Sequence, residues 1–145
     1  MPASAQELFA EVLKTTFGPT LRATGLRGSG QPYSLPSDSH FAVLGFQKSQ
    51  FSDANAVEFT INVKVVPKEV WATVRTERPH FPAKPSPNTG YGSFEWHQRI
   101  GQLLPGGEDR WWILRLDDDN KSTVAEVLSV LTDVSVPARR TAIHT

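Results

Sequence analysis

The stretch HFAVLGFQKSQ at residues 40–50 is followed by FSDAN at 51–55 and by AVEFTINVKVV at 56–66. The first and third stretches are rich in β-branched and aromatic residues, which fit a pleated, partly buried surface. The break between them holds Asp53 and Asn55, whose side chains favour turns by bonding to the nearby backbone. Two strand-like stretches joined by about five residues are typical of a β-hairpin. We therefore expect the fold to be built on this hairpin.

Within 56–66, apolar and polar residues alternate, which places the two sets on opposite faces of a strand. The apolar set is Val57, Phe59, Ile61, Val63 and Val65, and the polar set is Glu58, Thr60, Asn62 and Lys64. This pattern predicts a half-buried strand with one inner face. The strand at 41–50 alternates less cleanly, so we expect cover on both of its sides. Its register stays open, because a slip of one residue would exchange its faces.

The remaining pattern predicts terminal helices around further strands. A helix begins near Ser4 and Glu7, which have capping-box spacing, and could continue to Gly25 with a kink or restart at Gly18-Pro19. Other expected elements are two short strands within 26–35, a short helix at 68–76, a proline-rich loop at 78–92, strands at 94–101 and 110–117, and a helix near 122–133. We predict an α+β fold, with an antiparallel sheet of five or six strands and the helices at 4–24 and 121–133 packed on one face.

Composition narrows the class of protein. The 145 residues suit one domain, 1–145, with a frayed tail from about residue 138. Fifteen basic residues balance fifteen acidic ones, which disfavours nucleic acid as a partner. No cysteine is present, and neither a signal peptide nor a long apolar run can be seen. We expect a cytoplasmic protein that does not engage a membrane.

Several stretches together resemble one family. They are LRATGLRGSG after the first helix, FQKSQ and FTINVKV in the hairpin, Trp71, WHQRIGQL, WWIL, and a last helix that ends near VP. This order is similar to the domain of unknown function family numbered 4304, found mostly in bacteria, over roughly residues 5–138. One departure is Leu26, which follows Gly25 where the family usually has an aromatic residue. The resemblance supports the fold and implies no activity.

Motifs for metal, cofactor or nucleophile are missing from the sequence. The histidines His40, His80, His97 and His144 lack the spacing of a zinc helix motif. The acidic run 117–120 fails the pattern of a calcium loop, since Ser122 and Leu128 occupy the glycine and glutamate positions. No Gly-x-Ser-x-Gly elbow occurs. We therefore expect no metal and no cofactor.

Polar and aromatic residues near strand ends give the candidate site. Gln47, Lys48 and Gln50 end the first hairpin strand, where they could orient a polar ligand, or Gln47 could satisfy loop backbone groups instead. Trp111 and Trp112 should point to opposite faces, so one is core and the other is covered by the loop or forms a binding surface. The candidate binding residues are Gln47, Lys48, Gln50, His97, Arg99 and Trp111.

Two function classes stay open. The first is a soluble, non-catalytic binding or accessory module of a bacterial type, which uses a sheet face and the 78–92 loop to hold a protein or small-molecule partner. The second is a small enzyme whose acid–base residues His97, Arg99 and Glu95 converge on the sheet. The lack of a motif-level nucleophile, metal set or phosphate cradle favours the first class.

Overall fold

The hairpin predicted from the sequence is the centre of the fold. The computed structural model describes residues 2–135, 138 and 142–143. Strands β3 (His40–Lys48) and β4 (Ala56–Pro67) pair antiparallel in unbroken register, from His40 opposite Pro67 to Lys48 opposite Phe59. The pairing places Phe46 beside Ile61 on one face of the sheet and Gln47 beside Thr60 on the other. The expected pairing of the two strands is confirmed.

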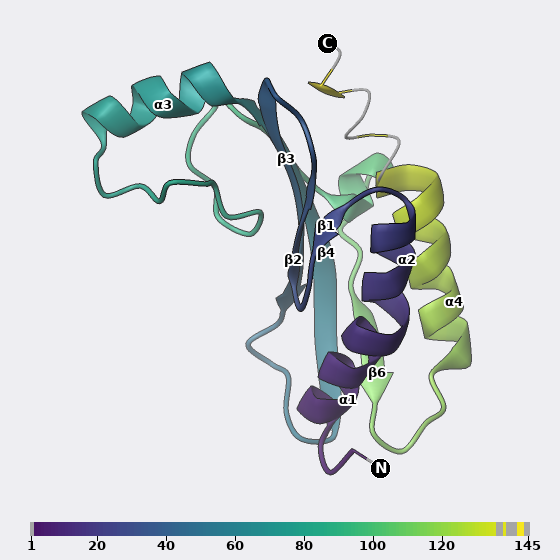
Figure 1. Cartoon of the computed structure of the whole chain (residues 1–145). Coiled ribbons are helices and arrows are strands. Elements are labelled where there is room, and N and C mark those ends of the chain that lie inside the picture. Colours follow the sequence, from purple (N-terminus) through teal and green to yellow (C-terminus); the bar gives the residue numbers. More distant parts are fainter. Residues whose placement is uncertain (1, 136–137, 139–141, 144–145) are drawn as a thin grey trace.

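The hairpin grows into a six-stranded antiparallel sheet (Figure 1). The short strands β1 (Arg27–Gly28) and β2 (Pro32–Leu35) extend it beyond β3. On the other edge of β4, β5 (Trp96–Arg99) pairs with residues 62–65 and β6 (Trp112–Arg115) pairs with residues 56–59. The predicted α+β class with five or six strands is confirmed.

Strands β5 and β6 are shorter than the predicted 94–101 and 110–117, and they follow one another along β4 instead of pairing together. The 3₁₀ helix η2 (Ile100–Leu103) ends β5, and residues 104–111 form an irregular connection before β6. Trp96 and Trp112 therefore lie in separate strands that both pair with β4 along one edge.

The N-terminal helix runs through α1 (Ala5–Val12), a π-helical turn η1 (Leu13–Phe17) and α2 (Gly18–Ala23). The wide turn lies just before Pro19, which cannot donate a backbone hydrogen bond. Gly25 takes a φ of 101°, and the N–H of Leu26 donates to the carbonyl of Leu21 at 3.1 Å. These features form the predicted glycine cap at the helix end.

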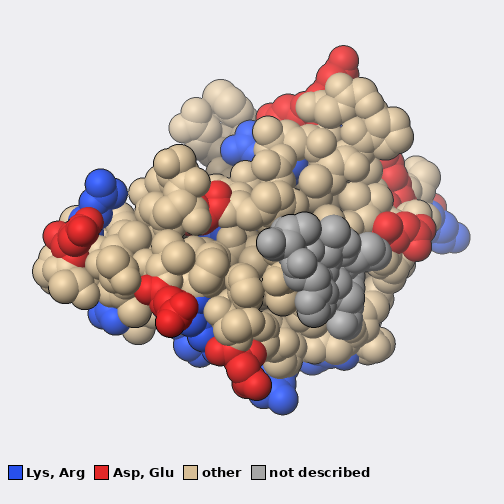
Figure 2. Space-filling model, turned by 90° about the horizontal axis from the view of Figure 1, so that it is seen from above, with Lys and Arg blue, Asp and Glu red and all other residues tan. Residues whose placement is uncertain are grey.

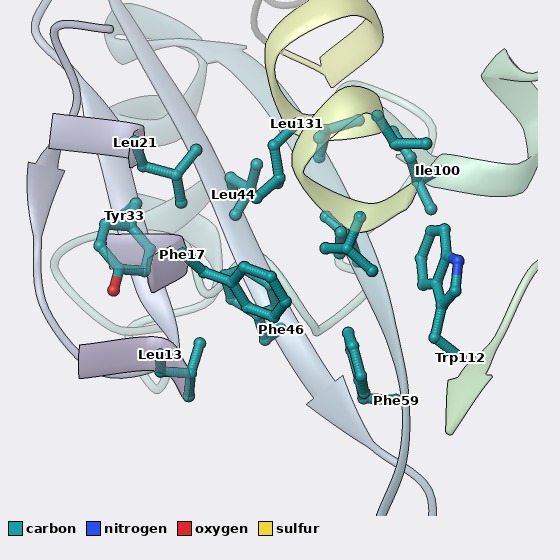
Figure 3. Packing of buried hydrophobic residues seen from close by; sticks show 14 of the residues in the cluster. Leu13, Phe17, Leu21, Tyr33, Leu44, Phe46, Phe59, Ile100, Trp112 and Leu131 are labelled. Carbon is teal, nitrogen blue, oxygen red and sulfur yellow. The ribbon is translucent and has the colours of Figure 1, made fainter. Parts of the chain in front are cut away.

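Helix α4 (Lys121–Val130) and the π-helical turn η3 (Leu131–Ser135) lie on the same face of the sheet as α1 and α2. The core between these helices and the sheet is aromatic. Phe17 stacks on Phe46 with ring centroids 5.6 Å apart, and Phe59 lies 5.9 Å from Trp112 (Figure 3). Trp112 is thus the core member of the tryptophan pair. Both terminal helices pack on one face as predicted.

The opposite face of the sheet is covered too, which corrects the expectation of a half-buried β4. Thr60, Asn62 and Lys64 have exposed fractions of only 0%, 3% and 0%. Helix α3 (Lys68–Glu77) and the long loop after it lie on this side of the sheet (Figure 1). We call residues 78–95 the covering loop. A small aromatic cluster, formed by Trp71, Phe81, Tyr91 and Phe94, holds the loop to α3.

The expected frayed tail from about residue 138 lies almost entirely outside the described residues, and the single-domain assignment likewise stays a prediction. None of the helices in the described part of the chain combines the length and the apolarity that a membrane span requires. Seen from above, the surface carries basic and acidic groups side by side (Figure 2).

Candidate functional site

A buried lysine fixes the covering loop to the sheet. Lys64 lies near the centre of β4, and its Nζ forms an ion pair with Oε2 of Glu95 at 3.1 Å. The same Nζ donates to the carbonyl of Ser86 at 2.8 Å and to the carbonyl of Thr89. It also lies 4.3 Å from the ring centroid of Tyr91. Nζ thus donates two hydrogen bonds to loop carbonyls, and its positive charge faces the Glu95 carboxylate and the Tyr91 ring of the same loop.

Two opposing effects act on the pKa of Lys64 in its buried pair with Glu95. Burial lowers the pKa of Lys64, and the hydrogen bond and charge of Glu95 oppose that shift. Glu95 is held from a second direction, because its Oε1 accepts the backbone N–H of Tyr91 at 2.8 Å. The Tyr91 hydroxyl in turn accepts the backbone N–H of Ser86 at 3.0 Å. The bond from Tyr91 satisfies Oε1 of Glu95, whereas Oε2 faces the Lys64 ammonium without a hydrogen bond of good geometry from the described residues, so the attraction between the two charges must offset part of the cost of burial.

A row of amides continues the covered face beside this pair. The Nδ2 of Asn62 donates to Oε1 of Gln47 at 2.7 Å and to Oδ1 of Asn88 at 3.0 Å. Asn88 then donates to the carbonyl of Phe46 at 3.2 Å. The loop approaches so closely that a Cβ added to Gly45 would lie 2.5 Å from Cγ of Pro87. Gln47 is therefore linked to the loop indirectly, through hydrogen bonds. Its side chain accepts a hydrogen bond from Asn62, not from the loop backbone, and Asn62 in turn bonds to Asn88 of the loop.

Next to the covered face lies an open pocket of about 420 Å³. The register of β4 and β5 sets His97 opposite Lys64 and Arg99 opposite Asn62. The described residues that line the pocket are Asn62, His97, Arg99, Gln102, Gly107 and Asp109. We call this space the polar pocket. It is the candidate functional site.

His97 lies between the polar pocket and the buried ion pair. Its Nδ1 is 3.7 Å from Oε1 of Glu95, beyond hydrogen-bonding distance. Its Nε2 is buried without a hydrogen bond of good geometry from the described residues, and the backbone of Pro87 lies close enough to act on the ring. Burial lowers the pKa of His97, the charge of Lys64 lowers it further, and Glu95 opposes both effects. The folded state therefore favours the neutral imidazole.

The rim of the polar pocket carries an exposed ion pair. Nη1 of Arg99 and Nε1 of Trp111 both donate to Oδ2 of Asp109, at 3.0 Å and 2.9 Å. The guanidinium also lies 5.2 Å from the ring centroid of Trp111. Burial would raise the pKa of Asp109, but the bonds from Trp111 and Arg99 outweigh it and the pKa is lowered. Gln102 accepts the backbone N–H of Arg99 at 2.8 Å, which fixes the end of β5.

The structure brings some of the predicted site residues together and separates others. His97 and Arg99 line the polar pocket. Gln47 and Trp111 do not line it, but they are hydrogen-bonded to the lining residues Asn62 and Asp109, respectively. Lys48 is exposed at the end of β3, and Gln50 is exposed in the turn that follows. Because β3 pairs in unbroken register, these two residues do not join Gln47 in one site.

Sequence reasoning missed Asn62, Gln102, Gly107 and Asp109. Asn62 carried a signal, since an amide between apolar neighbours in a long strand needs a partner once it is covered. Asp109 and Gly107 lie in the connection between β5 and β6, and only the fold shows where that connection packs. Among the residues that the structure describes, no group of three or more His, Cys, Asp or Glu side chains could hold a metal ion.

Comparison with known proteins identifies the family. Residues 17–140 match the family described as Domain of unknown function (DUF4304), and this stretch is most of the 145-residue chain. The chain therefore belongs to that family. No curated protein and no solved structure matched the chain. The predicted resemblance is confirmed.

Proposed function

We propose that the chain is a non-catalytic binding module that holds a small polar ligand in the polar pocket. The observation that carries this proposal is an open space of about 420 Å³ lined by side chains that are nearly all polar. Ligand sites commonly enclose roughly 300–1,000 Å³. The covering loop fills the centre of the adjacent sheet face, so the ligand would meet the edge of that face. The absence of cysteine fits a reducing compartment, which supports a cytoplasmic location.

The pocket offers charges of both signs to a ligand. The side chains of Arg99 and Asp109 are 36% and 51% exposed, and an ion pair of that exposure stabilises a fold by only about 0–1 kcal/mol. A ligand carboxylate could pair with the guanidinium of Arg99, while a ligand ammonium could pair with Asp109. The preferred ligand is therefore a small zwitterion with the chemistry of an amino acid.

The contacts already made by the candidate acid–base residues favour binding over catalysis. Glu95 is committed to Lys64 and to the backbone of Tyr91, so its carboxylate is already occupied by contacts within the protein. The lowered pKa of His97 favours its neutral form, and its side chain lines the pocket. These features support recognition of polar groups.

One observation favours a small enzyme as the second candidate. Nδ1 of His97 approaches Oε1 of Glu95 to 3.7 Å, and such contacts can tighten when substrate binds. In that case His97 would transfer a proton, Glu95 would orient it, and Arg99 would hold the substrate's negative charge.

Ligand-observed NMR with each of the twenty standard amino acids tests both candidates. The matched pair of variants is Arg99→Gln in the pocket and Arg115→Gln, an exposed arginine on β6. We expect saturation transfer to at least one amino acid in the wild type and in Arg115→Gln, and its loss in Arg99→Gln. Failure of all twenty to bind, or equal binding by both variants, would overturn the proposal. Consumption of the bound amino acid during overnight incubation would assign the enzyme instead.

A further inference from the structure

A second and larger cavity lies on the same side of the sheet, at its β1–β2 edge. Its volume is about 650 Å³. The described residues that line it include Arg27, Ser34, Phe41, Val43, Lys68 and Lys84. We call it the basic cavity. It shares no lining residue with the polar pocket.

Three separate segments direct cations into the basic cavity. Arg27 lies opposite Ser34, and Ser34 lies opposite Val43, so these side chains share the sheet face that points away from the helical core. Lys68 begins α3, and Lys84 belongs to the covering loop. Basic residues from segments far apart in the sequence thus surround a cavity whose base is the sheet.

The cations of this cavity are poorly neutralised by the protein itself. Within the described part of the chain, the side chains of Arg27 and Lys84 form no hydrogen bond or ion pair with other residues. Nζ of Lys68 donates to the carbonyl of Ser37 at 2.7 Å, which leaves ammonium donors for a ligand. Asp38 is the single carboxylate among the described lining residues. Cations gathered in a concave space attract an anion more strongly than scattered surface charges do.

We propose that the basic cavity binds a small organic anion with an apolar body. The anionic head would lie among Arg27, Lys68 and Lys84. The apolar body would lie against Phe41 and Val43, where the Phe41 ring already has Lys68 5.4 Å from its centroid. A phosphate and a carboxylate both satisfy the head-group chemistry, since both accept several charge-assisted hydrogen bonds.

Titration of ¹⁵N-labelled protein followed by NMR tests the proposal. The probes are phenyl phosphate and benzoate, with phenol as the uncharged probe of the same ring. The variants are Arg27→Glu/Lys84→Glu and the matched control Lys14→Glu, an exposed lysine of the N-terminal helix. Arg27 and Lys84 are exposed, so the double variant should fold, and a thermal melt checks this. If it melts early, Lys84→Glu alone replaces it.

We expect phenyl phosphate, benzoate or both to shift amides of residues 27–43. The Kd should rise about tenfold or more in the double variant, stay the same in Lys14→Glu, and increase with added salt. The tighter of the two anions identifies the head group. Three results would each overturn the proposal: no binding of either anion, phenol binding as tightly as the anions, or an equal loss of affinity in Lys14→Glu.

Discussion

Lys64 and Glu95 form an ion pair at 3.1 Å between the middle of the sheet and the loop that covers it, with side chains 0% and 2% exposed. The pair explains why a face that reads as polar in the sequence is buried in the fold. Lys64 is long enough to reach loop carbonyls and a carboxylate at once, so a cation replaces apolar packing as the contact between the two layers.

Removal of the buried lysine should therefore destabilise the protein strongly. Lys64→Met leaves Glu95 buried without its cation, and we expect the free energy of unfolding to fall by about 3–5 kcal/mol. The double change Lys64→Met/Glu95→Gln should restore part of the loss, because no isolated charge remains. Urea denaturation measures both. A loss below about 1 kcal/mol in the single variant would show that the pair contributes little.

Both faces of β4 should be sensitive to mutation. Ile61→Ala truncates a residue of the helical core and should cost about 2–5 kcal/mol. On the other face, the hydroxyl of Thr60 donates to the carbonyl of Arg110 at 2.6 Å, so Thr60→Ala should cost about 1–3 kcal/mol. Thr60→Ser, which keeps the hydroxyl, is the control. A Thr60→Ala variant as stable as the wild type in denaturant melts would contradict the buried second face.

Close approach of the covering loop makes one glycine critical. A Cβ on Gly45 would lie 2.5 Å from Pro87 and 2.6 Å from Asn88, whereas a Cβ on Gly90 meets only His97 at an ordinary 3.9 Å. Gly45→Ala should therefore displace the loop and speed amide exchange over residues 84–95, at a cost of about 1–3 kcal/mol. Gly90→Ala should leave exchange unchanged. Equal exchange in both variants would place the loop farther from the sheet.

Local chemistry made much of the fold predictable. The alternation of 56–66, the glycine cap at Gly25 and the helical spacing near the two ends each reflect short-range rules, and the structure follows them. The lengths of β5 and β6 were not predictable, because they depend on which part of β4 each strand pairs with. The alternation also predicted that Lys64 would be exposed, which is wrong. Its partner Glu95 is distant in sequence and is brought to Lys64 only by the packing of the covering loop.

The candidate site was predictable only in part. His97 and Arg99 alternate on one short strand, so a shared face could be inferred from period alone. Asp109 joins them across a glycine-rich connection, whose path depends on the packing of η2 and Gly101. A Cβ on Gly101 would lie 2.7 Å from the backbone nitrogen of Arg110, so the connection returns tightly over η2. Such tertiary contacts have no local signature.

The lowered pKa of His97 predicts a pH dependence of stability. Burial and the charge of Lys64 disfavour the imidazolium in the folded state, so the pKa lies below the ordinary 6.5. As the pH falls through that value, the unfolded chain takes up a proton before the folded chain does, and the free energy of unfolding decreases. This contribution is complete above the unfolded pKa and is lost as the pH falls toward the folded one.

Comparison of the wild type with His97→Gln isolates that effect from other titrating groups. Urea melts at about pH 7.5 and about pH 5.5 should show a smaller loss of stability on acidification in the variant. The same loss in both proteins would mean that His97 titrates normally in the fold.

The most direct measurement on the polar pocket is a map of ligand contacts on the protein. Titration of ¹⁵N-labelled protein with the standard amino acids should shift the amides of residues 97–109 and the side-chain Nε–H of Arg99, as expected for a zwitterion held between Arg99 and Asp109. Arg115→Gln should give the same map, and Arg99→Gln should give none. Shifts confined to residues outside the pocket, or no shifts with any amino acid, would contradict the assignment of this pocket as the binding site.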